Sequence, residues 1–165
     1  MTARTSRRSL LLAGASALAL SACGFKLRGP QTLAFETIYL GSLYNALDGE
    51  LRREIQYSGK TRVVRDPKEA QVRIDVLRND RSREILSLSA DGSVREYELE
   101  RVIVYRLLDN AGNEIRPASL LRARREYDFS DSLVLSKSRE EALLFDDMER
   151  DIIQQLMRRL ASVRL

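Results

Sequence analysis

An Asp-Gly dipeptide at positions 91–92 separates two runs in which apolar and polar residues alternate, and this pattern constrains the fold most. Alternation with period two is typical of half-buried strands, and Asp-Gly is a strong hairpin signal. We therefore expect a long two-stranded ribbon around a two-residue turn, with Leu86 opposite Tyr97 and a bulge within the polar stretch 78–84. The residues expected on the buried face are Val72, Ile74, Val76, Leu86 and Leu88 before the turn, and Tyr97, Leu99, Ile103, Tyr105 and Leu107 after it.

Further strands flank this ribbon. Short β-rich segments predict strands over 35–40 and 61–64. A second turn at 110–113 leads into a returning strand over 115–129, in which Pro117 is compatible only with a sheet edge or a bulge. The sheet is therefore expected to be mostly antiparallel, with four or five strands.

Two segments have helical periodicity. Apolar residues four apart predict a helix over 45–58, ended by Gly59. A longer amphipathic helix is expected to begin at a capping box formed by Ser138 and Glu141 and to run to Val163. Because these apolar stripes need a partner layer, the sequence predicts an α+β two-layer sandwich in which two helices pack on one face of the sheet.

The N-terminus carries the pattern of an export signal. A head with three arginines and no acid precedes an apolar run over 10–20, which is too short to cross a bilayer. The only cysteine follows in Leu20-Ser21-Ala22-Cys23, which is similar to a bacterial lipobox. We predict a signal peptide over 1–22, a lipidated tether over 23–34 attached through Cys23, and a single domain over 35–165. The alternative is an ordinary signal peptide with a chance cysteine beside its cleavage site.

Removal of the leader changes the charge balance. Three of the 28 basic residues lie in it, which leaves 25 basic and 24 acidic groups and a formal charge of +1. Nucleic-acid-binding proteins concentrate positive charge, so no nucleic-acid partner is expected. The chain has no histidine, and its one thiol is assigned to lipid. The usual nucleophile–histidine pairs and histidine metal sites are thus excluded, and we expect a non-enzyme without cofactor or metal.

Several basic residues lie close to apolar positions. Arg122, Arg124 and Arg125 crowd the last strand, Arg95 is close to the hairpin turn, and Lys137 precedes the long helix. Such groups beside apolar side chains suit an anionic amphiphile, because phosphates accept charge-assisted hydrogen bonds and acyl chains make apolar contacts. The alternative is ion pairing with acids of the same domain.

Two stretches carry a family resemblance. Residues 23–29, Cys-Gly-Phe-Lys-Leu-Arg-Gly, resemble the mature N-terminus of the LPS-assembly lipoprotein family (LptE), and residues 147–164 are similar to its closing helix. The resemblance implies a non-enzymatic lipoprotein, anchored on the periplasmic side of the outer membrane. Such proteins plug and help to assemble the β-barrel partner LptD, and they bind lipopolysaccharide during its delivery to the cell surface.

The resemblance also implies contact residues. Lys137 matches a basic position linked to lipopolysaccharide in the family, and Arg95 lies near a second one at the hairpin tip. The competing hypothesis is a periplasm-facing lipid-binding or transport-accessory lipoprotein without a barrel partner.

Overall fold

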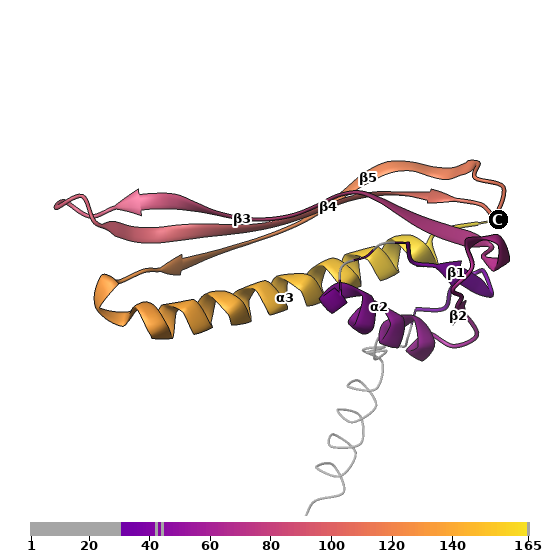
Figure 1. Cartoon of the computed structure of the whole chain (residues 1–165), viewed down its shortest axis with the longest axis horizontal. Coiled ribbons are helices and arrows are strands. Elements are labelled where there is room, and N and C mark those ends of the chain that lie inside the picture. Colours follow the sequence, from indigo (N-terminus) through magenta and orange to yellow (C-terminus); the bar gives the residue numbers. More distant parts are fainter. Residues whose placement is uncertain (1–30, 42, 44, 165) are drawn as a thin grey trace, which may run out of the picture.

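The computed structural model describes residues 31–41, 43 and 45–164, and in them a five-stranded sheet is covered on one face by two helices (Figure 1). The predicted signal peptide and Cys23 lie outside the described residues. In chain order the elements are β1 (Thr37–Tyr39), α2 (Asn45–Tyr57), β2 (Arg62–Val63), the 3₁₀ turn η1 (Pro67–Glu69), β3 (Val72–Leu88), β4 (Val94–Leu108), β5 (Glu114–Asp128), the 3₁₀ turn η2 (Asp131–Leu133) and α3 (Val134–Ala161). The predicted α+β sandwich is confirmed.

The sheet order is β2-β1-β3-β4-β5. β1 runs parallel to both β2 and β3, whereas β3, β4 and β5 form an antiparallel meander. β1 pairs only with the first two residues of β3, Val72 and Arg73. The rest of this 17-residue strand extends away from β1 for about 50 Å at the usual rise per residue.

The first hairpin turn differs from the expected two-residue form. Ser89 and Ser93 close the first loop, and the N–H of Gly92 donates to the Ser89 carbonyl at 3.0 Å. Gly92 has φ +86°, a left-handed conformation that glycine adopts without steric cost. The loop therefore has three residues, as hairpins with a type I turn and a left-handed third residue do.

The expected register was also wrong. Ile85, not Leu86, lies opposite Tyr97, because Leu86 is an extra residue at a register shift. A second shift makes Leu77 an extra residue, so the bulges flank the polar stretch 78–84 instead of interrupting it. Each extra residue reverses which side chains face the helices. Leu86, predicted on the buried face, is accordingly exposed, and Leu88, also predicted to be buried, is exposed beside the hairpin loop.

The apolar core lies at the end of the sandwich near β1. There α2 and the second half of α3 pack together beneath the sheet (Figure 1). The fully buried side chains include Ile38, Leu47, Leu51, Ile55, Ile74, Leu107, Met148, Ile152 and Leu160. We call this the proximal end, and the opposite end, with the β3–β4 hairpin and the start of α3, the distal end. None of the described helices is long and apolar enough to cross a bilayer.

The long helix begins earlier than predicted. α3 starts at Val134, directly after η2, and its N-cap residue Leu133 makes no side-chain capping bond. Ser138 lies inside the helix, where its hydroxyl donates to the Val134 carbonyl at 2.9 Å. The expected capping box is therefore wrong, and Glu141 is free to face the sheet.

Candidate functional site

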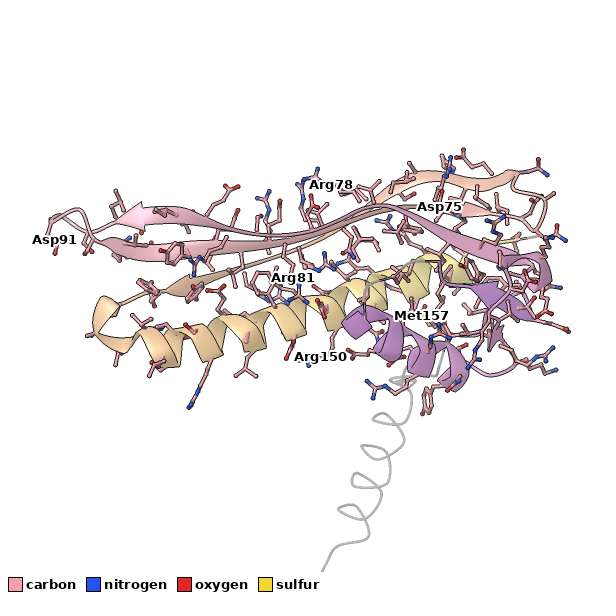
Figure 2. All side chains as sticks on the ribbon, viewed as in Figure 1. Asp75, Arg78, Arg81, Asp91, Arg150 and Met157 are labelled. Atoms are coloured by element: carbon pink, nitrogen blue, oxygen red, sulfur yellow. The ribbon has the colours of Figure 1, made fainter. Side chains whose placement is uncertain are left out.

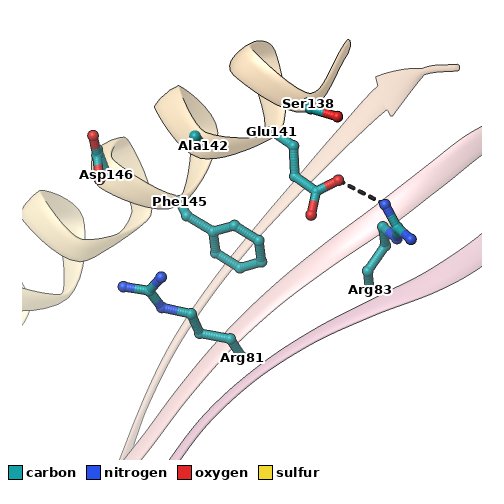
Figure 3. Close-up of a pocket in the computed structure, with 7 residues that line it drawn as sticks. All are labelled: Arg81, Arg83, Ser138, Glu141, Ala142, Phe145 and Asp146. Atoms are coloured by element: carbon teal, nitrogen blue, oxygen red, sulfur yellow. Dashed lines mark hydrogen bonds and ion pairs between the residues drawn. The ribbon is translucent and has the colours of Figure 1, made fainter. Parts of the chain in front are cut away.

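A groove lies between β3 and the first half of α3 at the distal end. α3 packs under β4 and β5, and β3 has no neighbouring strand on its outer side there, which leaves this space open to solvent. The groove has a volume of about 400 Å³. It is lined by Arg81, Arg83, Ser138, Glu141, Ala142, Phe145 and Asp146 (Figure 3).

The bulge at Leu77 explains why arginines enter this space. Before it, Val72 and Ile74 face the core. After it, the alternation is shifted by one residue, so that Arg81 points toward α3 and Arg78 away from it (Figure 2). The polar stretch thus supplies the helix-facing side of the ribbon with cations.

Glu141 joins the two layers near the hairpin. Its Oε2 accepts a hydrogen bond from Arg83 Nη1 at 2.8 Å and another from the Tyr127 hydroxyl at 2.7 Å. The Arg83 guanidinium also lies 4.6 Å from the centre of the Tyr97 ring, a cation–π contact. Burial and the hydrogen bond to Glu141 raise the pKa of Tyr127 to about 12, and the bond to Glu141 raises the pKa of Arg83.

A buried charge cluster lies further along α3. Arg81 pairs with Glu149, and Arg101 Nε lies 3.7 Å from the same carboxylate. Arg101 also donates to the Asp80 carbonyl at 2.7 Å and bonds to Asn79. Burial lowers the pKa of Arg101, and the Glu149 charge opposes that shift. These fixed ion pairs hold the layers in register and provide no activated nucleophile.

The structure places both predicted basic residues at the distal end but not in the groove. Lys137 Nζ pairs with Glu140 at 2.8 Å, and its side chain is mostly buried, with 17% exposed. Arg95 is the extra residue of a bulge in β4 and donates to Ser87 at 3.2 Å and to Glu96 at 3.0 Å. Each cation therefore has a polar partner, and no contact joins the two among the described residues.

The predicted cluster on the last strand is divided between the two faces of the sheet. Arg125 faces α3 and bonds to Asp147 at 2.7 Å. Arg122 and Arg124 point to the other face, where both pair with Glu100. Ion pairing within the domain, the alternative left open by the sequence, accounts for these three residues.

Exposed apolar side chains surround the distal end. They come from the hairpin and from the first turns of α3, and they are Ile85, Leu86, Leu88, Leu133, Val134, Leu135 and Leu143. Sequence reasoning missed this surface because it assigned Leu86 and Leu88 to the core and began the long helix only at Ser138. The run Leu133-Val134-Leu135 outside any strand pattern was the available signal.

Within the described ranges, no group of His, Cys, Asp or Glu side chains could hold a metal ion. The groups that the distal end does offer are the charged, hydroxyl and apolar side chains described above, which are suited to binding.

Comparisons with known proteins agree with this architecture. The family model LptE, described as lipopolysaccharide-assembly, matches residues 34–160. The LPS-assembly lipoprotein LptE of Pectobacterium atrosepticum is 27% identical over 158 residues, covering 93% of this chain and 84% of that protein.

Solved structures show the same fold. The solution NMR structure of an uncharacterized lipoprotein B from Nitrosomonas europaea has 33% identity and a TM-score of 0.73, covering 84% of this chain and 91% of that one. The crystal structure of the rare lipoprotein B from Shewanella oneidensis has 22% identity and a TM-score of 0.65, covering 76% and 94%.

Proposed function

The chain belongs to the LptE lipopolysaccharide-assembly family, whose members are non-enzymatic assembly lipoproteins, and from this premise we propose how it acts. It is anchored to the outer membrane on the periplasmic side, occupies the lumen of the LPS-assembly β-barrel LptD, assists assembly of that barrel, and binds lipopolysaccharide with its distal end. The observation that carries the binding role is the exposed apolar surface beside Arg95 and Lys137 at one end of the ribbon.

The proposed anchor is Cys23, lipidated after removal of residues 1–22. Seven residues, 24–30, separate it from Gln31, the first described residue, and the eight Cα-to-Cα steps between them span at most about 28 Å when extended. β1 follows at the proximal end of the sandwich. The lipid therefore tethers the proximal end, and the hairpin can extend up to about 50 Å away from it.

The distal end has the chemistry that lipopolysaccharide requires. Its acyl chains can contact the leucines of the hairpin and of the first turn of α3, at about 25 cal/mol per Å² of apolar surface buried. Its phosphates can accept charge-assisted hydrogen bonds from Lys137 and Arg95. Because both cations already have carboxylate partners, a phosphate must compete with Glu140 or Glu96, which favours reversible binding over tight capture.

The remaining surface suits a wet barrel lumen. The outer face of the sheet carries alternating charges, with Arg124 paired to Glu98 and Glu100. Barrel interiors are polar, so a plug with charges of both signs and a mature formal charge of +1 can be accommodated without large repulsion.

The binding role is tested by titrating the mature lipoprotein, in detergent, with fluorescent lipopolysaccharide. Lys137→Glu should weaken binding about tenfold, equivalent to about 1.4 kcal/mol, while the circular dichroism spectrum stays unchanged. Lys68→Glu is the matched control, since Lys68 is exposed in η1 at the proximal end. Equal affinities for the two variants would remove Lys137 from the site.

A further inference from the structure

The outer edge of β3 is an unpaired strand edge. Only Val72 and Arg73 have a partner strand on that side, and from Ile74 to Leu88 no described strand lies beside it (Figure 1). Such an edge presents backbone N–H and C=O groups that another chain can pair with.

Part of this edge is regular. Between the extra residues Leu77 and Leu86, each residue from Arg78 to Ile85 has one partner in β4, without a register shift. These eight residues give a regular edge about 26 Å long. Bulges usually prevent edge pairing, so their confinement to the two ends leaves the segment between them available.

The groove beside this edge completes a binding surface. Ser138, Ala142 and Asp146 of α3 are exposed and line the groove, and the Phe145 ring points from α3 toward the strands (Figure 3). A strand added to β3 would direct alternate side chains toward these residues. We propose that the β3 edge over 78–85, together with this groove, binds an extended polypeptide segment of a protein partner by β-strand addition.

The charges in the groove define the side chains of that segment. Arg83 is paired with Glu141 and Arg81 with Glu149. Asp146 has no ion-pair or hydrogen-bond partner among the described residues, so its carboxylate is available to a basic side chain. Phe145 and Ala142 supply apolar contacts. The groove-facing positions of the segment should therefore alternate a basic and an apolar side chain.

Two other occupants fit these observations less well. A second copy of this chain would present Arg81 and Arg83 at the groove-facing positions of its own β3, but both are already paired with glutamates. An anionic lipid would meet the unpaired carboxylate of Asp146. The proposal goes beyond lipopolysaccharide binding and shares only Ile85 with the surface assigned to it.

The test uses the mature chain and the peptide Thr-Leu-Thr-Lys-Thr-Leu-Thr-Lys, which presents leucine and lysine on one face. Hydrogen exchange of residues 78–85, followed by NMR, should slow at least tenfold at the outward amides when the peptide is bound. Two versions, N-methylated at all odd or all even backbone nitrogens, are the peptide controls, and the version that cannot pair should not bind. No change in exchange, or equal binding of all versions, would overturn the proposal.

Reversing the charges of Asp146 and of the peptide tests whether the groove contacts the bound segment. Asp146→Lys should weaken peptide binding at least tenfold, and replacing the peptide lysines by glutamates should restore it. Glu114→Lys, at the exposed start of β5, is the control and should have no effect. Slowed exchange without peptide, together with a dimer in ultracentrifugation, would assign the edge to a second copy and contradict the proposal. Lys137→Glu should leave peptide binding unchanged, so this proposal and lipopolysaccharide binding can fail separately.

Discussion

Arg101 Nε lies 3.7 Å from the Glu149 carboxylate in the interior of the sandwich, where the two side chains are 4% and 7% exposed. On the C-terminal side of Glu149, α3 faces the apolar core. On its N-terminal side, α3 is joined to the ribbon by the hydrogen bonds that Glu141 accepts from Arg83 and Tyr127, and also by the partly buried ring of Phe145. The pair therefore lies where the apolar proximal core gives way to an interface that combines ion pairs with apolar contacts.

Removing one partner of this pair should be strongly destabilising. Glu149→Gln leaves the Arg101 guanidinium buried without a counter-charge, for which we expect a loss of about 3–5 kcal/mol in the free energy of unfolding, measured in urea. The double variant Glu149→Leu with Arg101→Met should recover most of that loss, because no buried charge remains. A loss below about 1 kcal/mol in the single variant would show that the pair is solvated.

The raised pKa of Tyr127 predicts a pH dependence. In the unfolded chain the phenol ionises near pH 10, whereas in the folded protein burial and Glu141 keep it protonated until about pH 12. Its contribution to stability is complete below pH 10 and is lost as the pH rises through 12, by at most about 3 kcal/mol. The free energy of unfolding should fall less steeply over this interval in Tyr127→Phe, and equal slopes would contradict the assignment.

Two glycines with positive φ should differ in their response to alanine. At Gly41 the added Cβ would lie 2.5 Å from the Ile74 carbonyl oxygen, whereas at Gly92 nothing lies within 4 Å. Gly92→Ala should cost about 1 kcal/mol, from backbone strain alone. Gly41→Ala adds a clash with backbone and should cost about 3 kcal/mol. Thermal unfolding of both variants measures the difference, and equal losses would argue against the close approach of Gly41 to β3.

The exposure of Leu88 makes a prediction of its own. Leu88→Ser should change the free energy of unfolding by less than about 0.5 kcal/mol, because Leu88 is exposed, but it should weaken lipopolysaccharide binding. Leu99→Ala, at a fully buried position of β4, should instead cost about 2–5 kcal/mol. Urea denaturation of both variants checks these two degrees of burial. A comparable loss in Leu88→Ser would place that side chain in the core.

Periodicity predicted the order of the elements, because the alternating residues of β4 and β5 and the apolar stripe of α3 pack on one another. It did not predict the path of β3. The stretch 78–84 has no apolar period, since ion pairs to Glu141 and Glu149 replace apolar contacts there, and those glutamates are about 60 residues away in sequence. Local signals could not locate the bulge at Leu77 that brings Arg81 and Arg83 to the helix.

The start of α3 was mispredicted for a related reason. Its N-cap, Leu133, has no side-chain capping bond, and the helix follows directly from η2, so no residue marked the boundary. The predicted site residues Lys137 and Arg95 do lie at the distal end. The groove and the edge of β3 depend on how α3 crosses the sheet, which no local pattern encodes.

Native mass spectrometry of the tagged chain, purified from outer membranes in mild detergent, tests the central claim most directly. The account predicts a complex of one chain with one LPS-assembly β-barrel, in which the chain begins at Cys23 and carries the mass of its lipid. A chain that retains residues 1–22, lacks lipid, or is recovered without the barrel would contradict it.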